Sequence, residues 1–429
     1  MALTTEDSGK ISYDKYVTEI DVQYIVKKYC NDSNYAMLDH YSVKTASTKM
    51  LGFLSDYLKI TIYTKNSKTE AKETIQCFLK CISKVNKAKE AMVRDLNLLS
   101  KEVIFYSDVK NKLYSPAIKP WSPRFITSIK DAIVLENLNA RGYKVRDKLV
   151  AFEENHTLQV LKTLAAFHAA SIIFEERNSK KLQNTYRLND EFDILSTVGA
   201  YEKCDPWFVQ CMDGALQAIK NHSKYYKNEK CIKSIEEKWQ TVWESALHLS
   251  NYSTKHRNVI CHRDLWNNNI LFHYADDDGR DVPDDCLLVD FQAFKSQPPA
   301  GDVMCFLYCN LDQNYRNENL SKFLNYYYSE LQNNLTSHGL SADLLSINEF
   351  LESCEEQRLW GLIVSACLLP LTWIDDQITT TVFTDTVHFD NILFKDRASF
   401  ILKMMESNNI YKQKVLTIFE EIIETYCLN

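Results

Sequence analysis

The stretch that most constrains this chain spans residues 259–292, where polar side chains stand at the edges of two apolar runs. It begins with VICHRDLWNNNILF and, after an acidic loop, ends with CLLVDFQ. Short apolar runs on both sides of a loop predict a β-hairpin. This hairpin would present Asp264 and Asn269 before the loop and Asp290 after it.

Phosphoryl transfer from a nucleotide requires this set of side chains. One carboxylate accepts the proton of the attacking hydroxyl group, and an amide and a second carboxylate hold the Mg²⁺ that bridges the phosphates of ATP. His-Arg-Asp-Leu-x-x-x-Asn followed by Asp-Phe matches the catalytic loop and metal motif of kinases. A buried hairpin whose polar residues satisfy turns is the alternative. We predict Asp264 and Asn269 as catalytic residues and Asn269 and Asp290 as Mg²⁺ ligands.

Two departures separate this stretch from protein kinases: Asp-Phe-Gln stands in place of Asp-Phe-Gly, and no Ala-Pro-Glu follows. The chain resembles instead the small-molecule branch of the kinase superfamily, the aminoglycoside and choline kinase-like enzymes. Within that branch, His-x-Asp-x-Trp-x-x-Asn and Val-Asp-Phe-Gln resemble the ecdysteroid kinase-like (CHK kinase-like) family, known mainly from insects. The resemblance extends from Tyr41 to the C-terminal helices.

Length and charge limit the classes of partner. A chain of 429 residues exceeds the usual size of one domain, so we expect two lobes or one domain with a large helical insertion. A hydrophobic content of 45% with 25% charged residues is ordinary for a globular protein. The net charge of −7 disfavours a nucleic acid partner, because phosphate backbones require clustered Lys and Arg. The expected partner is a small-molecule hydroxyl acceptor.

Cysteine usage and the N-terminus favour a reducing, cytoplasmic location. The chain has 13 Cys, an odd number, without a Cys-x-x-Cys pair, and its first residues are polar with no secretory signature. Cys305 and Cys309 lie among apolar residues and are expected in the core. The most membrane-like run, residues 359–374, is shorter than the roughly 20 residues of a span and contains Pro370. We predict a buried helix there, no membrane partner and a monomer.

The N-terminal part alternates between helix and strand patterns. Residues 13–29 carry apolar side chains at helical spacing, and residues 58–63 and 74–80 alternate like strands. The turn at residues 49–56 would cover the phosphates of ATP in a kinase, but it holds one glycine, Gly52, where the glycine-rich loop holds three. Gly52 is therefore a weak signal and fits an ordinary turn.

Lys80 ends the second of these strands, and a lysine in such a place is usually a solvated strand end. It lies, however, after the expected phosphate-covering hairpin and before a predicted helix at residues 85–106. The resemblance aligns Glu102 of that helix with the glutamate that pairs with the phosphate-binding lysine. Glu90 is the rival partner. The resemblance also implies that residues 132–138 form the hinge, with backbone groups of Glu136 and Leu138 bonding adenine.

Three further polar residues have structural interpretations. His168, near the end of an amphipathic helix predicted at residues 157–173, is expected to be a satisfied core histidine. The resemblance implies that His262 braces the backbone of the catalytic loop. The resemblance assigns Asp302 to structural support of the same loop.

The acceptor surface is expected to come from Trp266, from helices predicted around residues 207–220 and 230–249, and from the C-terminal helices. These elements supply aromatic bulk and one acidic pair, Asp375 and Asp376. The mixture suits an uncharged skeleton with hydroxyl groups at least as well as a cation. The aromatic side chains are Trp207, Phe208, Trp239, Trp243 and Trp360.

We therefore predict a bilobal α+β protein kinase-like fold. An N-lobe at residues 1–138 has an antiparallel sheet with one main helix, and a larger, mostly helical C-lobe spans residues 139–429. The resemblance implies an ATP- and Mg²⁺-dependent kinase acting on a hydroxyl of an ecdysteroid or another lipophilic or xenobiotic alcohol. Alternatives are a choline-type kinase and an inactive ligand-binding pseudokinase, although pseudokinases usually lose one of the residues retained here. A protein kinase is disfavoured by the missing Ala-Pro-Glu.

Overall fold

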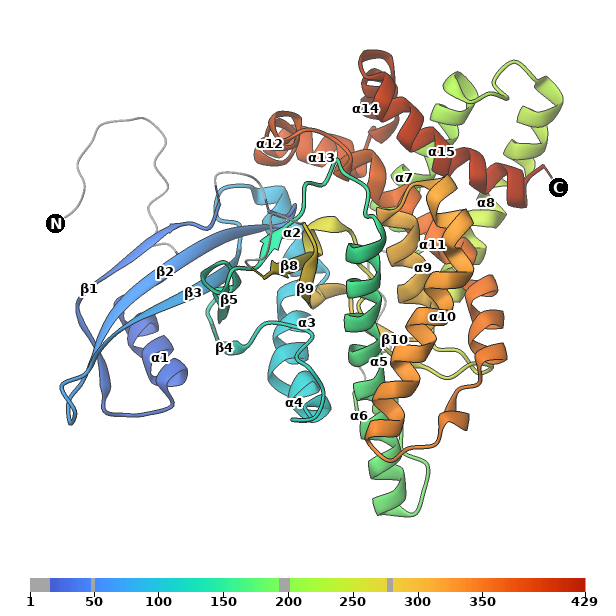
Figure 1. The fold of residues 1–429 in the computed structure, drawn as a ribbon. Helices are drawn as coiled ribbons and strands as arrows, with labels where there is room; N and C mark the ends of the chain where they lie inside the picture. The colour runs from blue at the N-terminus through green and yellow to red at the C-terminus, as the bar shows by residue number, and fades with distance from the viewer. Residues whose placement is uncertain (1–15, 48–50, 193–200, 276–280, 429) are drawn as a thin grey trace. The chain divides into compact units, whose positions relative to one another are not determined.

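The computed structural model describes residues 16–47, 51–192, 201–275 and 281–428 (Figure 1). The chain divides into two compact units: residues 1–93 with 124–141 form the first, and residues 94–123 with 142–429 form the second. The expected α+β class, with an antiparallel sheet in the N-terminal part and a mostly helical C-terminal part, is confirmed. The division differs from the expected boundary at residue 138, because residues 94–123 group with the helical unit.

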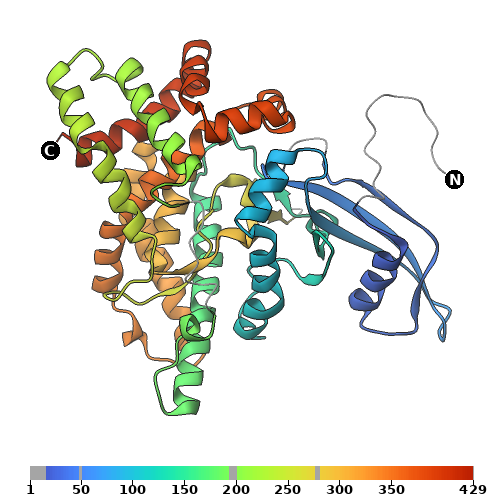
Figure 2. The same ribbon diagram turned by 180° about the vertical axis from the view of Figure 1, so that it is seen from behind.

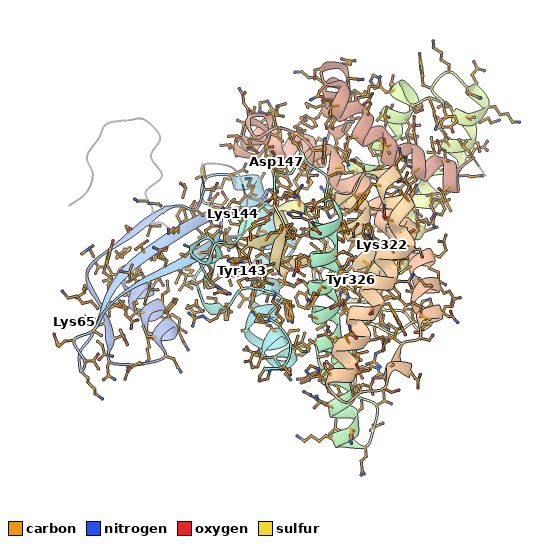
Figure 3. All side chains as sticks on the ribbon, viewed as in Figure 1. Lys65, Tyr143, Lys144, Asp147, Lys322 and Tyr326 are labelled. Atoms are coloured by element: carbon orange, nitrogen blue, oxygen red, sulfur yellow. The ribbon has the colours of Figure 1, made fainter. Side chains whose placement is uncertain are left out.

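A five-stranded antiparallel sheet forms the centre of the first unit, in the order β1-β2-β3-β5-β4. The two strands predicted from sequence alternation are confirmed and form its middle, where β2 and β3 pair without a bulge. Their turn is marked by Lys65, labelled in Figure 3. The strands are β1 (Tyr35–Thr45), β2 (Ser55–Asn66), β3 (Lys72–Ile82), β4 (Phe125–Ile129) and β5 (Ala132–Glu136).

Helix α1 (Glu19–Cys30) supplies the other half of this core. Its N-terminus carries a capping box in which Thr18 and Asp21 exchange side-chain and backbone hydrogen bonds, and it ends at Asn31 in the left-handed conformation. Val22 and Ile25 are fully buried among the apolar side chains of the sheet. A helix was expected from residue 13, but residues 13–15 lie outside the described part of the chain.

The prediction of one continuous helix at residues 85–106 is wrong. The chain forms α2 (Lys87–Asp95) and then α3 (Leu98–Ile104), with Asn97 between them in the left-handed conformation at φ 51°. Asparagine tolerates this conformation better than most residues, so the break costs little conformational free energy there. The helical path continues after α3 as a π-helical turn (Phe105–Val109) and α4 (Lys110–Leu113).

The second unit is built on long helices that lie side by side in both ribbon views (Figures 1 and 2). The central helix α5 (Glu154–Leu182) contains the predicted helix at residues 157–173 and packs against α10 (Gln313–Ser337). Lys322 of α10, labelled in Figure 3, forms an ion pair with Glu154 of α5, with 2.6 Å between Nζ and Oε1.

Helix α11 (Ile347–Thr372) packs along α9 (Pro299–Asn310) and also contacts α7, α8 and α15. The helices predicted around residues 207–220 and 230–249 are confirmed as α7 and α8. The others are α6 (Leu188–Glu191), α7 (Pro206–His222), α8 (Glu229–Leu249), α12 (Asp376–Thr384), α13 (Thr386–Phe394), α14 (Arg397–Ser407) and α15 (Asn409–Tyr426).

The aromatic side chains expected at the acceptor surface are in fact core residues. Phe208 packs on Trp243 with 5.5 Å between ring centroids, and Trp239 packs on Trp243 with 5.6 Å. None of the five is more than 9% exposed, because α7, α8 and α11 bury their apolar faces against one another. The buried set is Trp207, Phe208, Trp239, Trp243 and Trp360.

Small antiparallel strand groups hold the catalytic stretch in the second unit. The predicted hairpin is confirmed as β8 (Ile270–Tyr274) paired with β9 (Pro283–Leu288), and β6 (Lys144–Val145) adds to β8. A separate pair joins β7 (Val259–Cys261) to β10 (Lys295–Gln297). The chain segments on either side of the hairpin are therefore fixed by strand pairing.

One helix of the described residues, α5, has the length and apolar composition to cross a bilayer, but 78% of its most apolar window is buried in the protein. A bent pair, residues 342–372 with α12, passes the same test at an angle of 95°. The buried helix predicted at residues 359–374 is confirmed in α11, which extends two residues past Pro370. All 13 cysteines are free thiols, and Cys305 and Cys309 are buried as predicted.

Candidate active site

One carboxylate fixes the conformation of the loop that follows β7. Asp302, in the first turn of α9, accepts hydrogen bonds from the backbone amides of His262 at 2.6 Å and Arg263 at 2.7 Å. Arg263 has a left-handed backbone at φ 70°, a conformation that costs a non-glycine residue free energy. The two bonds offset that cost, and the predicted supporting role of Asp302 is confirmed.

His262 braces the loop from the inside, as predicted. Its Nδ1 accepts a hydrogen bond from the backbone amide of Asp264 at 3.3 Å, so its proton resides on Nε2, which donates to the carbonyl of Val289 at 2.8 Å. The ring also packs on Phe291, with 4.5 Å between centroids. His262 thereby joins the loop before the hairpin to the segment after it.

Asp264 and Asn269 contact each other directly. Asn269 Nδ2 donates to the backbone carbonyl of Asp264 at 2.8 Å and to its carboxylate Oδ2 at 3.0 Å. The backbone carbonyl of Asn269 accepts from the amide of Val289 at 3.0 Å. The amide nitrogen of Asn269 therefore fixes the direction of the Asp264 carboxylate.

Asp290 lies at the other end of the hairpin with a left-handed backbone at φ 68°. The next amide, that of Phe291, donates to Glu102 Oε1 at 3.2 Å, so α3 and the Asp-Phe-Gln segment are linked. The ring of Phe291 stacks on Phe105 at 4.1 Å with an interplanar angle of 9°. This contact explains why residues 94–123 group with the second unit.

Tyr106 is fully buried next to this group. Burial raises the pKa of its hydroxyl well above the usual value, and the nearby negative charges of Glu102 and Asp290 raise it further. Two carboxylates thus lie close to one apolar cluster.

His168, Cys261 and Asp302 form a buried group close enough together to hold a metal ion. However, Asp302 Oδ2 accepts from the His262 amide and also contacts His168 Nε2 at 3.1 Å. The other ring nitrogen of His168 contacts the Tyr327 hydroxyl at 2.7 Å. The group is satisfied internally, which confirms the prediction that His168 is a core residue.

Of the residues expected to bind nucleotide, three lie in the first unit. Lys80 is 4% exposed and stands in the middle of the sheet, opposite Tyr57 of β2 and Ile133 of β5. Glu136 ends β5, and its carboxylate accepts from the Arg124 amide at 2.7 Å and pairs with Arg141. The expected pairing of Lys80 with Glu102 joins different units and stays a prediction.

The backbone of the expected hinge is partly occupied. The amide of Glu136 donates to the carbonyl of Arg124 at 3.0 Å. The expected bond of the Glu136 carbonyl oxygen to adenine stays a prediction. Leu138 begins a 3-10 helix (Leu138–Arg141) and is 6% exposed. Its assignment stays a prediction.

Gly52 has a stronger reason to be glycine than a turn alone. A Cβ atom at this position would lie 2.3 Å from the hydroxyl oxygen of Tyr57. The neighbouring Lys49 and Met50 of the expected phosphate-covering turn lie outside the described residues. Glu90, the rival partner of Lys80, forms an ion pair with Lys87, with 2.7 Å between Nζ and Oε2.

Sequence reasoning missed Asn310, which also supports the loop. Its Nδ2 donates to the carbonyl of Leu265 at 2.7 Å from the last turn of α9. A signal was present, because Asn310 is a polar residue at the end of an otherwise apolar helical run and is 4% exposed. Asp147, labelled in Figure 3, was also missed; its carbonyl accepts from Asn267 Nδ2 at 3.1 Å.

The donor set fits Mg²⁺. The nitrogen of the Asn269 side chain is committed to Asp264, so its oxygen is the atom left for a cation, and Asp290 adds a carboxylate. Amide and carboxylate oxygens are the ligands that this hard cation takes in kinase sites. Asn269 and Asp290 are therefore the residues that would hold it.

Comparison with protein families and with a curated relative gives a consistent result. The family described as ecdysteroid kinase-like matches residues 49–340, a range that includes Lys80, Glu102 and the whole catalytic stretch. The "Uncharacterized kinase-like protein D1044.1" of Caenorhabditis elegans is 26% identical over 306 residues, covering 66% of this chain and 72% of that protein.

Solved structures similar to this chain include several small-molecule kinases. A choline kinase from Cryptosporidium parvum Iowa II aligns with 14% identity, 90% of each chain and a TM-score of 0.45. An ethanolamine kinase of Plasmodium vivax aligns with 12% identity over 94% of this chain and 95% of that one, with a TM-score of 0.41. The aminoglycoside 2'-phosphotransferase-IIIa in its GDP complex aligns with 10% identity over 95% and 99%, with a TM-score of 0.36.

Proposed function

This chain belongs to the ecdysteroid kinase-like family, and we propose that it transfers the terminal phosphoryl group of ATP to a hydroxyl group of a small molecule. The observation that carries the proposal is the hydrogen bond between Asp264 and Asn269, in a loop whose backbone is held by Asp302. An inactive ligand-binding relative would not need to keep this pair in register with Asp290.

The proposed reaction assigns each step to a residue of the loop. Asp264 orients the acceptor hydroxyl and takes its proton as the oxygen attacks the terminal phosphorus. Asn269 keeps the Asp264 carboxylate in one direction through the 3.0 Å bond. Mg²⁺, when bound by Asn269 and Asp290, would neutralise charge on the phosphates.

Nucleotide binding is proposed for residues of both units. Lys80 would neutralise the α and β phosphates, with Glu102 as the partner that orients it. The carbonyl oxygen of Glu136 and the amide of Leu138 would bond the adenine ring. The low exposure of Lys80, 4%, supports a positioned side chain rather than a solvated one.

An uncharged, lipophilic alcohol such as an ecdysteroid or a xenobiotic alcohol is the proposed acceptor. A choline-type acceptor requires aromatic rings and acidic groups around its cation. Of the expected acidic pair, Asp375 caps α12 by accepting from the Ile378 amide at 2.8 Å. Asp376 lies 3.4 Å from Lys148 Nζ, so its charge is balanced within the protein. With the aromatic side chains of α7 and α8 buried, this arrangement favours a neutral skeleton over choline, which is the second candidate.

A small cavity beside the catalytic loop supports an acceptor with more than one hydroxyl group. Its volume is about 10 Å³, close to the space for one water-sized group, and Trp266, Asn267 and Lys148 contribute to its lining. Asn267 Oδ1 is buried without a hydrogen-bond partner among the described residues. A second hydroxyl group, which both donates and accepts, would bond Asn267 and the Lys148 ammonium together.

The test is a competition assay with labelled ATP and Mg²⁺ in which an ecdysone-type steroid, choline and a kanamycin-type aminoglycoside are present at equal concentration. We expect label in the steroid phosphate. Label only in phosphocholine or in the aminoglycoside would reject the lipophilic acceptor and retain the kinase. Asn267→Ala should raise the acceptor KM with little effect on the ATP KM, and equal values for both proteins would reject the role of the cavity.

A further inference from the structure

Three basic side chains converge next to the catalytic loop. Lys295 stands opposite Cys261 in the pairing of β10 with β7, two residues before Arg263 in the loop. Lys101 of α3 lies over the ring of Phe294, the neighbour of Lys295, with 5.4 Å from Nζ to the ring centroid. Strand pairing and this ring contact therefore bring cations from three separate segments of the second unit together.

All three side chains are withdrawn from solvent. Lys101 is 6% exposed, Lys295 is 5% exposed and Arg263 is 4% exposed. The guanidinium of Arg263 lies 5.6 Å from the ring centroid of Tyr201 and 5.1 Å from that of Trp360, so aromatic faces take the place of an acid. Its Nε has no hydrogen-bond partner among the described residues.

No ion pair to any of the three is found among the residues that the structure describes. Lys295 donates to the neutral amide oxygen of Asn251 at 2.7 Å. Asp302, the buried acid that acts on Arg263, uses its oxygens for the amides of His262 and Arg263. Glu202, the acid that acts on Lys295, is itself exposed.

A buried charge without a partner is costly, so native proteins pair or neutralise it. Here the cost of burial appears in the lowered pKa values of the two lysines. Burial lowers the pKa of Lys101 to about 7, with Arg263 and Lys295 lowering it further, and burial with Arg263 lowers that of Lys295 to about 8. Burial likewise lowers the pKa of Arg263. The group lacks the negative charge that would keep it fully protonated.

We propose that Lys101, Arg263 and Lys295 form a binding site for a tetrahedral oxyanion, a phosphate, sulfate or phosphoryl group. Two ammonium groups and a planar guanidinium match the several oxygens of such an anion better than the single plane of a carboxylate. The site is distinct from the residues proposed to hold ATP and Mg²⁺. Because Arg263 directly precedes Asp264, an occupant would stabilise the catalytic loop in its braced conformation.

The experiment measures thermal unfolding of the full chain with sodium sulfate or inorganic phosphate against sodium chloride at equal ionic strength. We expect both oxyanions to raise the Tm of the wild-type protein beyond the effect of chloride. The double variant Lys101→Met/Lys295→Met should lose this increase. Without oxyanion it should melt at or above the wild-type Tm, since a repulsive buried pair has been removed.

Two control variants separate this site from other causes. Lys414→Met removes a largely buried lysine that has an acid partner, Asp312 at 2.6 Å, and should keep the oxyanion response. Lys80→Met should also keep it, because the response does not come from the proposed nucleotide site. An unchanged response in the double variant would overturn the proposal, as would a wild-type protein that responds neither as purified nor after phosphatase treatment.

A free anion and a phosphoryl group on the chain itself share this chemistry, and phosphatase treatment distinguishes them. A response of the protein as purified identifies a free anion as the occupant. A response that appears only after phosphatase treatment, with a matching loss of mass in the intact protein, identifies an attached phosphoryl group. A protein that responds in neither state contradicts the site.

Discussion

Asn269 and Asp264 are joined twice, because one amide nitrogen donates to both the carbonyl and the carboxylate of the aspartate at 2.8 and 3.0 Å. The bond to the carbonyl fixes the loop, and the bond to the carboxylate fixes the direction of its lone pairs. One residue therefore controls both the position and the orientation of the proposed proton acceptor.

Asp264→Asn should remove the proton acceptor while keeping the bond from Asn269, since the new side chain retains an amide oxygen. We expect kcat to fall by about 10²–10⁴-fold with the fold and the affinity for ATP preserved. Single-turnover kinetics and nucleotide-binding titration measure the two effects. Asp284→Asn, in the same hairpin and paired with His273, is the matched control and should be fully active. Wild-type turnover in Asp264→Asn would show that this residue is misassigned.

Asp290→Ala should abolish Mg²⁺-dependent activity, and Asn269→Ala should weaken it. Both residues act where the charge of the phosphates must be neutralised. Asn269→Ala also releases the Asp264 carboxylate, so excess Mg²⁺ should restore it only in part. Activity is measured across a Mg²⁺ titration, and an enzyme that is equally active in a chelator contradicts the metal assignment.

Lys80→Met should raise the ATP KM, lower kcat, or do both, and Glu102→Gln should have a smaller effect. Combined, the two changes should cost less than their sum, because residues that act as one unit are not additive. Glu102→Gln also keeps an oxygen for the Phe291 amide, so the effect reports the charge and not the loss of that bond. Strict additivity would exclude the pair, and Glu90→Gln would then be tested in the same cycle.

Lys101 should make stability depend on pH in a definite direction. Its pKa in the folded protein is about 7 against an ordinary value of 10.5, so between these values the unfolded chain binds more protons. The free energy of unfolding should therefore rise with pH from about 7 towards 10.5, by at most about 1.4 kcal/mol per pH unit from this residue. Lys295 faces it and adds in the same direction from about pH 8. Urea unfolding of the wild-type protein and Lys101→Met across this range measures the effect, and parallel curves would exclude it.

Much of the site was predictable because its signals are local. The hairpin, the two loop residues and Asp290 follow from a contiguous stretch in which apolar runs fix the strands. The role of His168 also followed, since a histidine in an apolar run is usually satisfied by its neighbours, whereas the role of His262 came from the resemblance to the kinase fold. These predictions required no knowledge of distant contacts.

Other features depend on tertiary contacts that periodicity does not contain. The helix predicted at residues 85–106 breaks at Asn97, where a left-handed residue redirects the chain so that Phe105 can stack on Phe291. The aromatic residues of α7 and α8 have the same pattern whether they line a pocket or fill a core, and Trp243 proved fully buried. Likewise, the net charge of −7 gives no indication that Lys101 lies in a region with few acidic side chains.

The two backbone hydrogen bonds that Asp302 accepts also have a consequence for local unfolding of the protein. They link the catalytic loop across 40 residues to α9, and through His168 across 134 residues to α5. The loop therefore has no native form until these distant segments have assembled around it. Because partial opening of either helix would release the loop, we expect the amides of His262 and Arg263 to be among the slowest to exchange with solvent. Their protection would then report the integrity of the whole helical unit.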